Sequence, residues 1–181
     1  MLLLVSLLFG GTAMQLFAAD QVEGYWLQTD QHSGRPERLV LVYEHGQKVY
    51  GRILVSFNRD GTIRDTWLSP RMRADALAGS PFSAGLDFIY ELTPSQGHEW
   101  VGYLIDPGTG NEYDCHLWVD AQGRLVVRGQ LKGFLGSLLG GEQHWPPYAP
   151  EAVPALSALI ESGALVLPDP ASILPVIHRK K

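Results

Sequence analysis

Cysteine is the rarest residue of this 181-residue chain, which contains only Cys115. With one cysteine, no disulfide can form within the chain, so a disulfide-stapled scaffold is excluded and the fold depends on its core. Cys115 lies in an alternation that runs Tyr113, Cys115, Leu117 and Val119, which places it on one face of a strand. We therefore expect a buried, unreactive thiol, with a nucleophile as the alternative.

Charged residues are also scarce. They make up 18% of the chain, below the roughly 25% of typical soluble domains, and the formal net charge is −5. A nucleic-acid-binding domain would need a basic surface, so nucleic acid is excluded as a partner. Hydrophobic residues make up 45% of the chain, which argues against disorder, and the length fits one domain with a proper core.

The motifs of the common enzyme classes are missing. The sequence has no nucleophile elbow, no phosphate-binding glycine loop, no His-Glu-x-x-His and no paired cysteines. Asp106, Asp114 and His116 would suggest catalysis only if they met in one cleft. We predict that the protein is not an enzyme, has no catalytic residues and needs no cofactor.

One group of residues resembles a metal site. Glu112, Asp114 and His116 project from the same strand face at a period of two, and His98 could join them from a neighbouring strand. A solvated outward face explains the same spacing, because the intervening residues are apolar and take the inner side. We predict no metal site.

Charge is unevenly distributed along the chain. Residues 35–73 hold eight Lys or Arg and four acids, whereas residues 74–123 hold eight acids and no Lys or Arg. We expect strands of opposite sign to pair within the fold, with a bipolar surface for a charged ligand as the alternative. Arg71 and Arg73, beside Asp75, could clamp an anionic head group, although exposed loop charges usually have no specific role.

Turn residues are abundant, with 20 Gly and 12 Pro, and they separate short apolar and β-branched runs. This spacing predicts an all-β sandwich or barrel of about eight antiparallel strands. The expected strands are Val22–Thr29, Glu37–Glu44, Lys48–Phe57, Thr62–Leu68, Gly85–Leu92, Glu99–Asp106, Glu112–Val119 and Arg124–Leu131, with a short ninth at Gln143–Trp145.

One strand and one loop of this pattern lead to further predictions. In the run Gly85–Leu92, the alternation predicts that Phe88 and Tyr90 face one way and that Asp87 and Glu91 face water. The long break Ser69–Ala84 contains a stretch, Met72–Leu77, that could form a helical turn and lie as a lid over one barrel mouth.

The two ends of the chain differ from the strand-rich middle. Residues 1–19 are uncharged with an apolar run at Leu2–Phe9, which predicts a cleaved signal peptide and a periplasmic protein, with a retained anchor as the alternative. Residues 146–181 hold seven of the prolines and several apolar runs. We expect this extension to form a short helix from Pro154 to about Gly163 and to pack on the barrel of residues 20–145. Contact with an envelope protein or a membrane surface is its alternative role.

Three stretches together resemble a known family. They are Gly24-Tyr25-Trp26, then Trp100 to Pro107 with Gly110 and Tyr113, and then Leu125 to Gly129 with Gly133, Gly136, Gln143 and Trp145. This set is similar to the exported bacterial family called domain of unknown function 2147, for which we know no established activity. The chain departs from the family pattern in its long tail, in Ile105 before Asp-Pro and in Gln130 after Arg-Gly.

The resemblance implies a lipocalin-like, up-and-down β-barrel. The leading hypothesis is a non-enzymatic barrel in the cell envelope that binds a small apolar or amphipathic molecule. The candidate ligand-binding residues are Trp26, Phe88, Tyr90, Trp100 and Arg128. The aromatic residues could instead simply fill the barrel, with Trp26 plugging one end and Arg128 stacked on it. The other hypothesis is an interaction or structural module that acts through the C-terminal tail.

Overall fold

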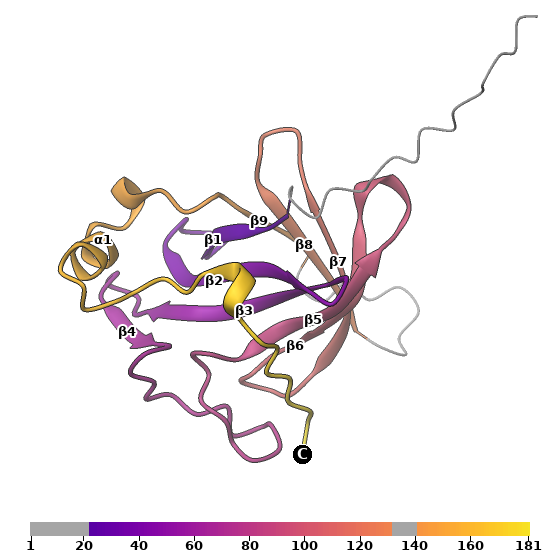
Figure 1. Cartoon of the computed structure of the whole chain (residues 1–181), viewed down its shortest axis with the longest axis horizontal. Helices are drawn as coiled ribbons and strands as arrows, with labels where there is room; N and C mark the ends of the chain where they lie inside the picture. Colours follow the sequence, from indigo (N-terminus) through magenta and orange to yellow (C-terminus); the bar gives the residue numbers. More distant parts are fainter. Residues whose placement is uncertain (1–21, 132–140) are drawn as a thin grey trace, which may run out of the picture.

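The computed structural model describes residues 22–131 and 141–181 of the chain (Figure 1). The expected signal peptide, residues 1–19, lies outside the described residues. Nine strands form one antiparallel sheet in the order β1-β2-β3-β5-β6-β7-β8-β9, with β4 paired to β3 in this described part. The strands are β1 (Gly24–Thr29), β2 (Pro36–His45), β3 (Lys48–Phe57), β4 (Ile63–Thr66), β5 (Asp87–Pro94), β6 (Trp100–Ile105), β7 (Glu112–Val119), β8 (Leu125–Leu131) and β9 (Glu142–Trp145).

The predicted all-β, antiparallel barrel is confirmed. The bounds of β3 and β7 are those expected from the sequence, since each strand ends at turn residues. The turn between β2 and β3 is formed by Gly46 and Gln47, whose φ angles of 59° and 63° are the positive values that a tight hairpin of type I′ requires. Local turn chemistry therefore fixes the up-and-down order of the strands.

The sheet curls until its two ends meet, and this makes it a nearly closed barrel (Figure 1). The chain that follows β9 runs antiparallel to β1, with an isolated bridge between Trp26 and Pro147. The Leu27 N–H donates to the Pro146 carbonyl over 2.9 Å, and the Tyr148 N–H donates to the Tyr25 carbonyl over 2.7 Å. These bonds satisfy backbone groups that an open sheet would leave at its edges.

The expected two-residue period fails in β5. The pairing of β3 with β5 shifts register between Gly51 and Arg52, and that of β5 with β6 shifts between Tyr90 and Thr93. Such bulges change which face a side chain occupies. The prediction that Asp87 faces water is wrong, because its carboxylate is fully buried beneath the C-terminal tail.

The segment between β4 and β5 forms turns rather than a helix. The Leu77 N–H donates to the Ala74 carbonyl over 3.0 Å, closing a single turn. Leu77 is fully buried and pairs with Lys180 through an isolated bridge. Met72, Arg73 and Ser83 line a hollow that adjoins the barrel mouth. The segment thus links the mouth to the tail.

The C-terminal extension contains the helix α1 (Pro154–Glu161) and the 3-10 turns η3 (Pro150–Ala152) and η4 (Pro170–Ser172). Helix α1 begins at the expected proline, and the chain leaves it at Gly163, where φ is 72°. The side chains of Val153, Leu156 and Leu165 are buried in the same core as the barrel residues. Neither α1 nor any other helix of the described chain has the length and apolarity needed to cross a membrane.

The end of the tail crosses the outer face of the barrel over β3 and β5 (Figure 1). Arg52 of β3 and Asp87 of β5 form a buried ion pair, in which Nε lies 3.0 Å from Oδ1 and Nη2 lies 2.6 Å from Oδ2. The Tyr43 hydroxyl donates to the same Oδ2 over 3.0 Å. From the tail, the Leu174 carbonyl accepts from Arg52 and the Val176 N–H donates to Asp87, both over 2.6 Å. The tail therefore completes the hydrogen bonding of a buried charge pair.

Candidate functional site

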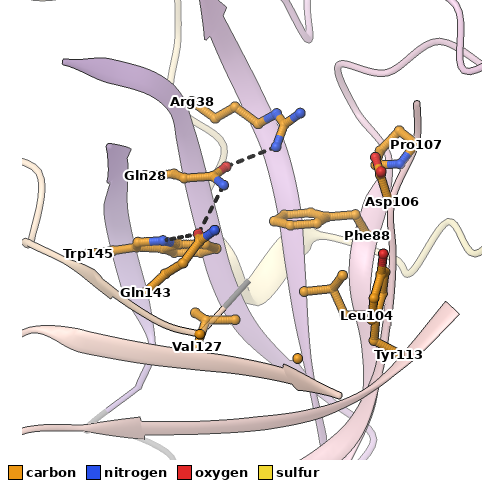
Figure 2. Close-up of a pocket in the computed structure, with 12 residues that line it drawn as sticks. Gln28, Arg38, Phe88, Leu104, Asp106, Pro107, Tyr113, Val127, Gln143 and Trp145 are labelled. Carbon is orange, nitrogen blue, oxygen red and sulfur yellow. Dashed lines mark hydrogen bonds between the residues drawn. The ribbon is translucent and has the colours of Figure 1, made fainter. Parts of the chain in front are cut away.

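The barrel contains a cavity of about 270 Å³ that opens to solvent at the end where β1, β6 and β8 finish (Figure 2). Its wall is built from seven strands, β1, β2 and β5 to β9, and from the β6–β7 turn. The residues that line it are Gln28, Arg38, Phe88, Leu104, Asp106, Pro107, Tyr113, Val127, Gly129, Gly141, Gln143 and Trp145. A concave, partly apolar space with a few convergent polar groups is the usual form of a small-molecule site.

One side of the cavity is apolar. The Phe88 and Trp145 rings stack with centroids 6.2 Å apart, and both side chains are buried. Leu104 and Val127 complete this side from β6 and β8, and Figure 2 shows them below the Phe88 ring. Gly129 follows Val127 on the same face of β8 and leaves room where a side chain would otherwise stand. This wall can bury apolar atoms of a ligand.

The wall next to Trp145 is polar and is organised by a chain of hydrogen bonds (Figure 2). The Trp145 Nε1–H can only donate, so its 2.9 Å bond fixes the carbonyl oxygen of Gln143 toward it. That oxygen also accepts from Gln28 Nε2 over 3.2 Å, and Gln28 Oε1 then accepts from Arg38 Nη1 over 3.0 Å. A donor-only indole thus determines the orientation of both amides and positions the guanidinium.

Arg38 brings a positive charge to the cavity wall. Burial lowers the pKa of its guanidinium, while the charges of Glu37 and Asp106 oppose this shift and that of Arg64 adds to it. An arginine remains protonated despite such a shift, so the cavity keeps a cation with a reduced hydration shell. In the described part of the chain, no carboxylate lies within ion-pair distance of Arg38.

Asp106 lies at the cavity rim, and its two carboxylate oxygens hold the β6–β7 turn. Oδ1 accepts from the Gly108 N–H over 2.9 Å, and Oδ2 accepts from the Thr109 hydroxyl over 2.7 Å. The turn-fixing role expected of an Asp before Pro accounts for these contacts. The carboxylate of Asp106 therefore holds the turn and adds negative charge to the rim.

The structure distributes the five candidate ligand-binding residues over three environments. Phe88 lines the cavity. Trp26 and Trp100 are buried in the core without lining it, and Trp26 Nε1 donates to the Val22 carbonyl over 2.9 Å. Tyr90 is buried at the outer face, where its ring lies 5.6 Å from that of Tyr103.

Arg128 also lies on the outer face of the barrel. It stands between the cavity-lining Val127 and Gly129, so the strand directs its side chain the other way. Its guanidinium lies 4.8 Å from the centre of the Trp118 ring, rather than over Trp26, and forms an ion pair with Glu142. Its cation–π contact is therefore an outer-surface contact.

Several cavity residues could not be selected from the sequence. Arg38 is a charged residue in a strand, and nothing near it in the sequence indicates that it lines a cavity, whereas Gln28 and Gln143 have one local signal. Gln28 follows the buried Trp26 by two residues, and Gln143 precedes the buried Trp145 by two, which places each pair on one strand face. A search for polar residues that share a strand face with tryptophan would have found both amides.

The residues that would suggest catalysis are not gathered in one cleft. Asp106 is at the cavity rim, whereas Asp114 and His116 line a hollow on the outer surface. His116 Nδ1 lies 3.1 Å from Glu99 Oε1, and no group of three His, Cys, Asp or Glu within residues 22–131 and 141–181 could hold a metal ion. Burial raises the pKa of the Cys115 thiol to about 12, which leaves it protonated at neutral pH.

Comparison with known families decides the classification. The family model described as "Uncharacterized protein conserved in bacteria (DUF2147)" matches residues 24–146, which is the barrel from β1 to the end of β9. The chain belongs to the DUF2147 family. The match ends where the C-terminal extension begins, so this DUF2147 barrel carries a tail beyond the family core.

The fold has a counterpart among solved structures. A protein from the human pathogen Helicobacter pylori, described as belonging to the lipocalin family, superposes with a TM-score of 0.54 and 16% sequence identity. The similarity covers 75% of this chain and 88% of the other. At this identity the likeness shows a lipocalin-like fold for the DUF2147 chain. No curated protein sequence matches it.

Proposed function

We propose that this DUF2147 protein is a binding module that holds one small apolar or amphipathic molecule inside its barrel. The observation that carries the proposal is the cavity lined by the Phe88–Trp145 stack and by the Arg38–Gln28–Gln143 chain. Eight-stranded barrels of this type have an interior just wide enough for side chains or for one small ligand. Here the interior near Gly129 is left open by the residues themselves.

The cavity volume limits the size of this molecule. A volume of 270 Å³ lies just below the ~300–1,000 Å³ of common small-molecule pockets, which favours a small ligand of about ten non-hydrogen atoms. An eight-carbon chain with one polar head is of this size. Longer lipids would have to extend from the mouth into solvent.

The proposed setting is the periplasm, and the proposed role is non-enzymatic. The support for export is the uncharged, apolar composition of residues 1–19. The support for binding over catalysis is that the Asp106, Asp114 and His116 side chains lie at separate places on the barrel. Fractionation of the producing cells and N-terminal sequencing of the mature protein test the first point.

Ligand binding is tested with octan-1-ol, which matches the cavity in size and carries no charge. Isothermal titration should give saturable binding with one site per chain, and native mass spectrometry should detect one bound molecule. Leu104→Trp places an indole in the cavity and should abolish binding. Val101→Trp is the matched control, because Val101 lies on the outer face of the same strand and does not line the cavity. Thermal melts must show that both variants fold.

Absence of saturable octanol binding to the unmodified protein, together with absence of a co-purified molecule, would refute the proposal. Equal binding by the Leu104→Trp and Val101→Trp variants would show that octanol binds elsewhere.

The extension is better explained as a structural cover than as an independent module. Its apolar residues Val153, Leu156 and Leu165 are used in the core, and its backbone completes the Arg52–Asp87 pair. A chain ending at Trp145 should therefore be less stable than the full chain in urea. If this shortened chain is equally stable but loses a protein partner, the tail acts as an interaction module.

A further inference from the structure

We propose that the molecule held in the barrel carries a carboxylate, and that Arg38 binds this group at the cavity mouth. This inference rests on the proposed binding function and adds the chemical class of the ligand. It follows from the unused donors of Arg38, from the charges around it and from the apolar wall opposite.

A guanidinium offers a pair of parallel N–H groups, on Nε and Nη2, that matches the two oxygens of a carboxylate. In this protein Arg52 shows that geometry, because its Nε and Nη2 donate to the two oxygens of Asp87 over 3.0 and 2.6 Å. Arg38 uses only Nη1, which donates to Gln28. Its Nε–H and Nη2–H have no acceptor among the described residues. The Nε–H and Nη2–H of Arg38 are therefore available to donate to a ligand carboxylate, as the same two groups of Arg52 donate to Asp87.

The charges near Arg38 favour an incoming anion. Arg38 also lines an adjoining hollow of about 180 Å³, and two further arginines, Arg64 and Arg73, line this hollow with it. None of the three has a carboxylate within ion-pair distance in the described part of the chain. Like charges gathered without a carboxylate at ion-pair distance repel one another, so binding of an anion between them relieves that repulsion.

Two features select a carboxylate over a more highly charged head group. Asp106 lines the cavity beside Arg38, and its negative charge disfavours a second negative charge on the ligand. The amide nitrogen of Gln143 has no acceptor among the described residues, so the polar wall offers an additional neutral donor. A singly charged, planar head suits this set of donors better than a phosphate dianion.

The apolar wall accepts the rest of the molecule. Phe88, Leu104 and Val127 lie across the cavity from the Arg38–Gln28 pair (Figure 2). A molecule with its head at Arg38 would place its chain against these side chains. The arrangement therefore fits an amphipathic acid of about ten non-hydrogen atoms, consistent with the cavity size.

The test compares three eight-carbon probes that differ in their heads: octanoate, octyl phosphate and octan-1-ol. Each is titrated into the full-length mature protein and into the variants Arg38→Gln and Arg38→Lys. Arg59→Gln is the control, because it removes the same charge from an exposed arginine that lines neither the cavity nor the adjoining hollow. The melting temperature of each variant shows whether it is folded.

We expect octanoate to bind at least about tenfold more tightly than octanol, because a charge-assisted pair of hydrogen bonds is added. Arg38→Gln should remove this advantage, so that octanoate and octanol bind the variant with similar affinities. Arg38→Lys should retain part of it, since it keeps the charge and loses the paired donors. Arg59→Gln should bind all probes as the unmodified protein does.

Two results would overturn the carboxylate assignment while leaving the binding function intact. One is equal affinity for octanoate and octanol, or octanoate affinity that does not change in Arg38→Gln. The other is tighter binding of octyl phosphate than of octanoate. If none of the three probes binds the unmodified protein, the proposed function itself fails.

Discussion

The backbone N–H of Val176 donates to Asp87 Oδ2 over 2.6 Å, which joins the tail to a fully buried carboxylate of the barrel. The same oxygen accepts from Arg52 and from the Tyr43 hydroxyl. A single carboxylate thus connects β2, β3, β5 and the C-terminal tail. Removal of its charge should affect both the stability of the barrel and the attachment of the tail.

The variant Asp87→Asn should be destabilised by about 3–5 kcal/mol, because it leaves the Arg52 charge buried without its partner. The measurement is the free energy of unfolding in urea. The tail should also become accessible, which limited proteolysis near Leu174 would detect.

Glu91→Gln is the matched control for Asp87→Asn, since both residues lie on β5 and both pair with a cation of β3. The Lys48–Glu91 pair is partly exposed, with side-chain exposures of 40% and 31%, and such pairs contribute about 1 kcal/mol or less. If the two variants lose equal stability, the buried pair is not the anchor described above.

Alkaline pH should destabilise the protein through Cys115. In the unfolded chain the thiol ionises near its ordinary value of 9.0, whereas in the folded protein burial raises the pKa to about 12. Its contribution to stability is therefore complete below pH 9 and is lost as the pH rises from 9 toward 12. Between pH 8 and 10, the unmodified protein should lose about 1.4 kcal/mol more than Cys115→Ala.

Urea unfolding of the unmodified protein and Cys115→Ala at the two pH values measures this difference. Burial also raises the pKa of Tyr43 and Tyr90, but both tyrosines are present in both proteins and their effects cancel. Parallel pH profiles for the two proteins would contradict the assignment, as would rapid alkylation of Cys115 in the native state.

Gly102→Ala should destabilise the barrel by about 1–3 kcal/mol through overpacking. A methyl group at Gly102 would lie 2.7 Å from Leu92 Cα and 2.8 Å from the Glu91 carbonyl oxygen, and neither backbone atom can move without disturbing β5. Thermal or urea unfolding measures the loss.

Gly129→Ala provides the comparison, because Cys115 pairs with Gly102 on one side and with Gly129 on the other. A methyl group at Gly129 would meet Tyr113 at 3.7 Å, an ordinary contact. This variant should stay within about 0.5 kcal/mol of the unmodified protein. An equal loss of stability in the two variants would mean that β5 and β6 move apart to accommodate the methyl group at Gly102.

Much of the fold could be read from the sequence because its signals are local. Glycines and aspartates mark the hairpin turns, and alternation identifies strands such as β7, in which Cys115 and Leu117 face the core. The helix α1 is likewise marked by Pro154 at its start and Gly163 after its end. Each of these signals depends on only a few neighbouring residues, so it can be recognised without knowing the contacts between distant segments.

The cavity could not be predicted because it depends on contacts between distant segments. Gln28 and Gln143 are 115 positions apart and meet only when the chain after β9 pairs with β1. The bulges of β5 place Phe88 in the cavity and Tyr90 on the outer face, although strict alternation puts them together. The pattern along each strand can place an amide on the same face as a tryptophan, but it does not show that Gln28 and Gln143 meet or that β5 contains bulges.

The pairing of the chain around Pro146–Tyr148 with β1 also has a consequence for how the protein folds. Tyr25 and Leu27 receive their partners from residues about 120 positions later, and Asp87 receives one of its partners from Val176. Contacts so distant in sequence carry a large loop-closure entropy and slow the folding of β-barrels. The chain through Tyr148 must therefore be available before the native barrel can close, and a chain that stops short of Val176 leaves the Asp87 carboxylate without one of its donors.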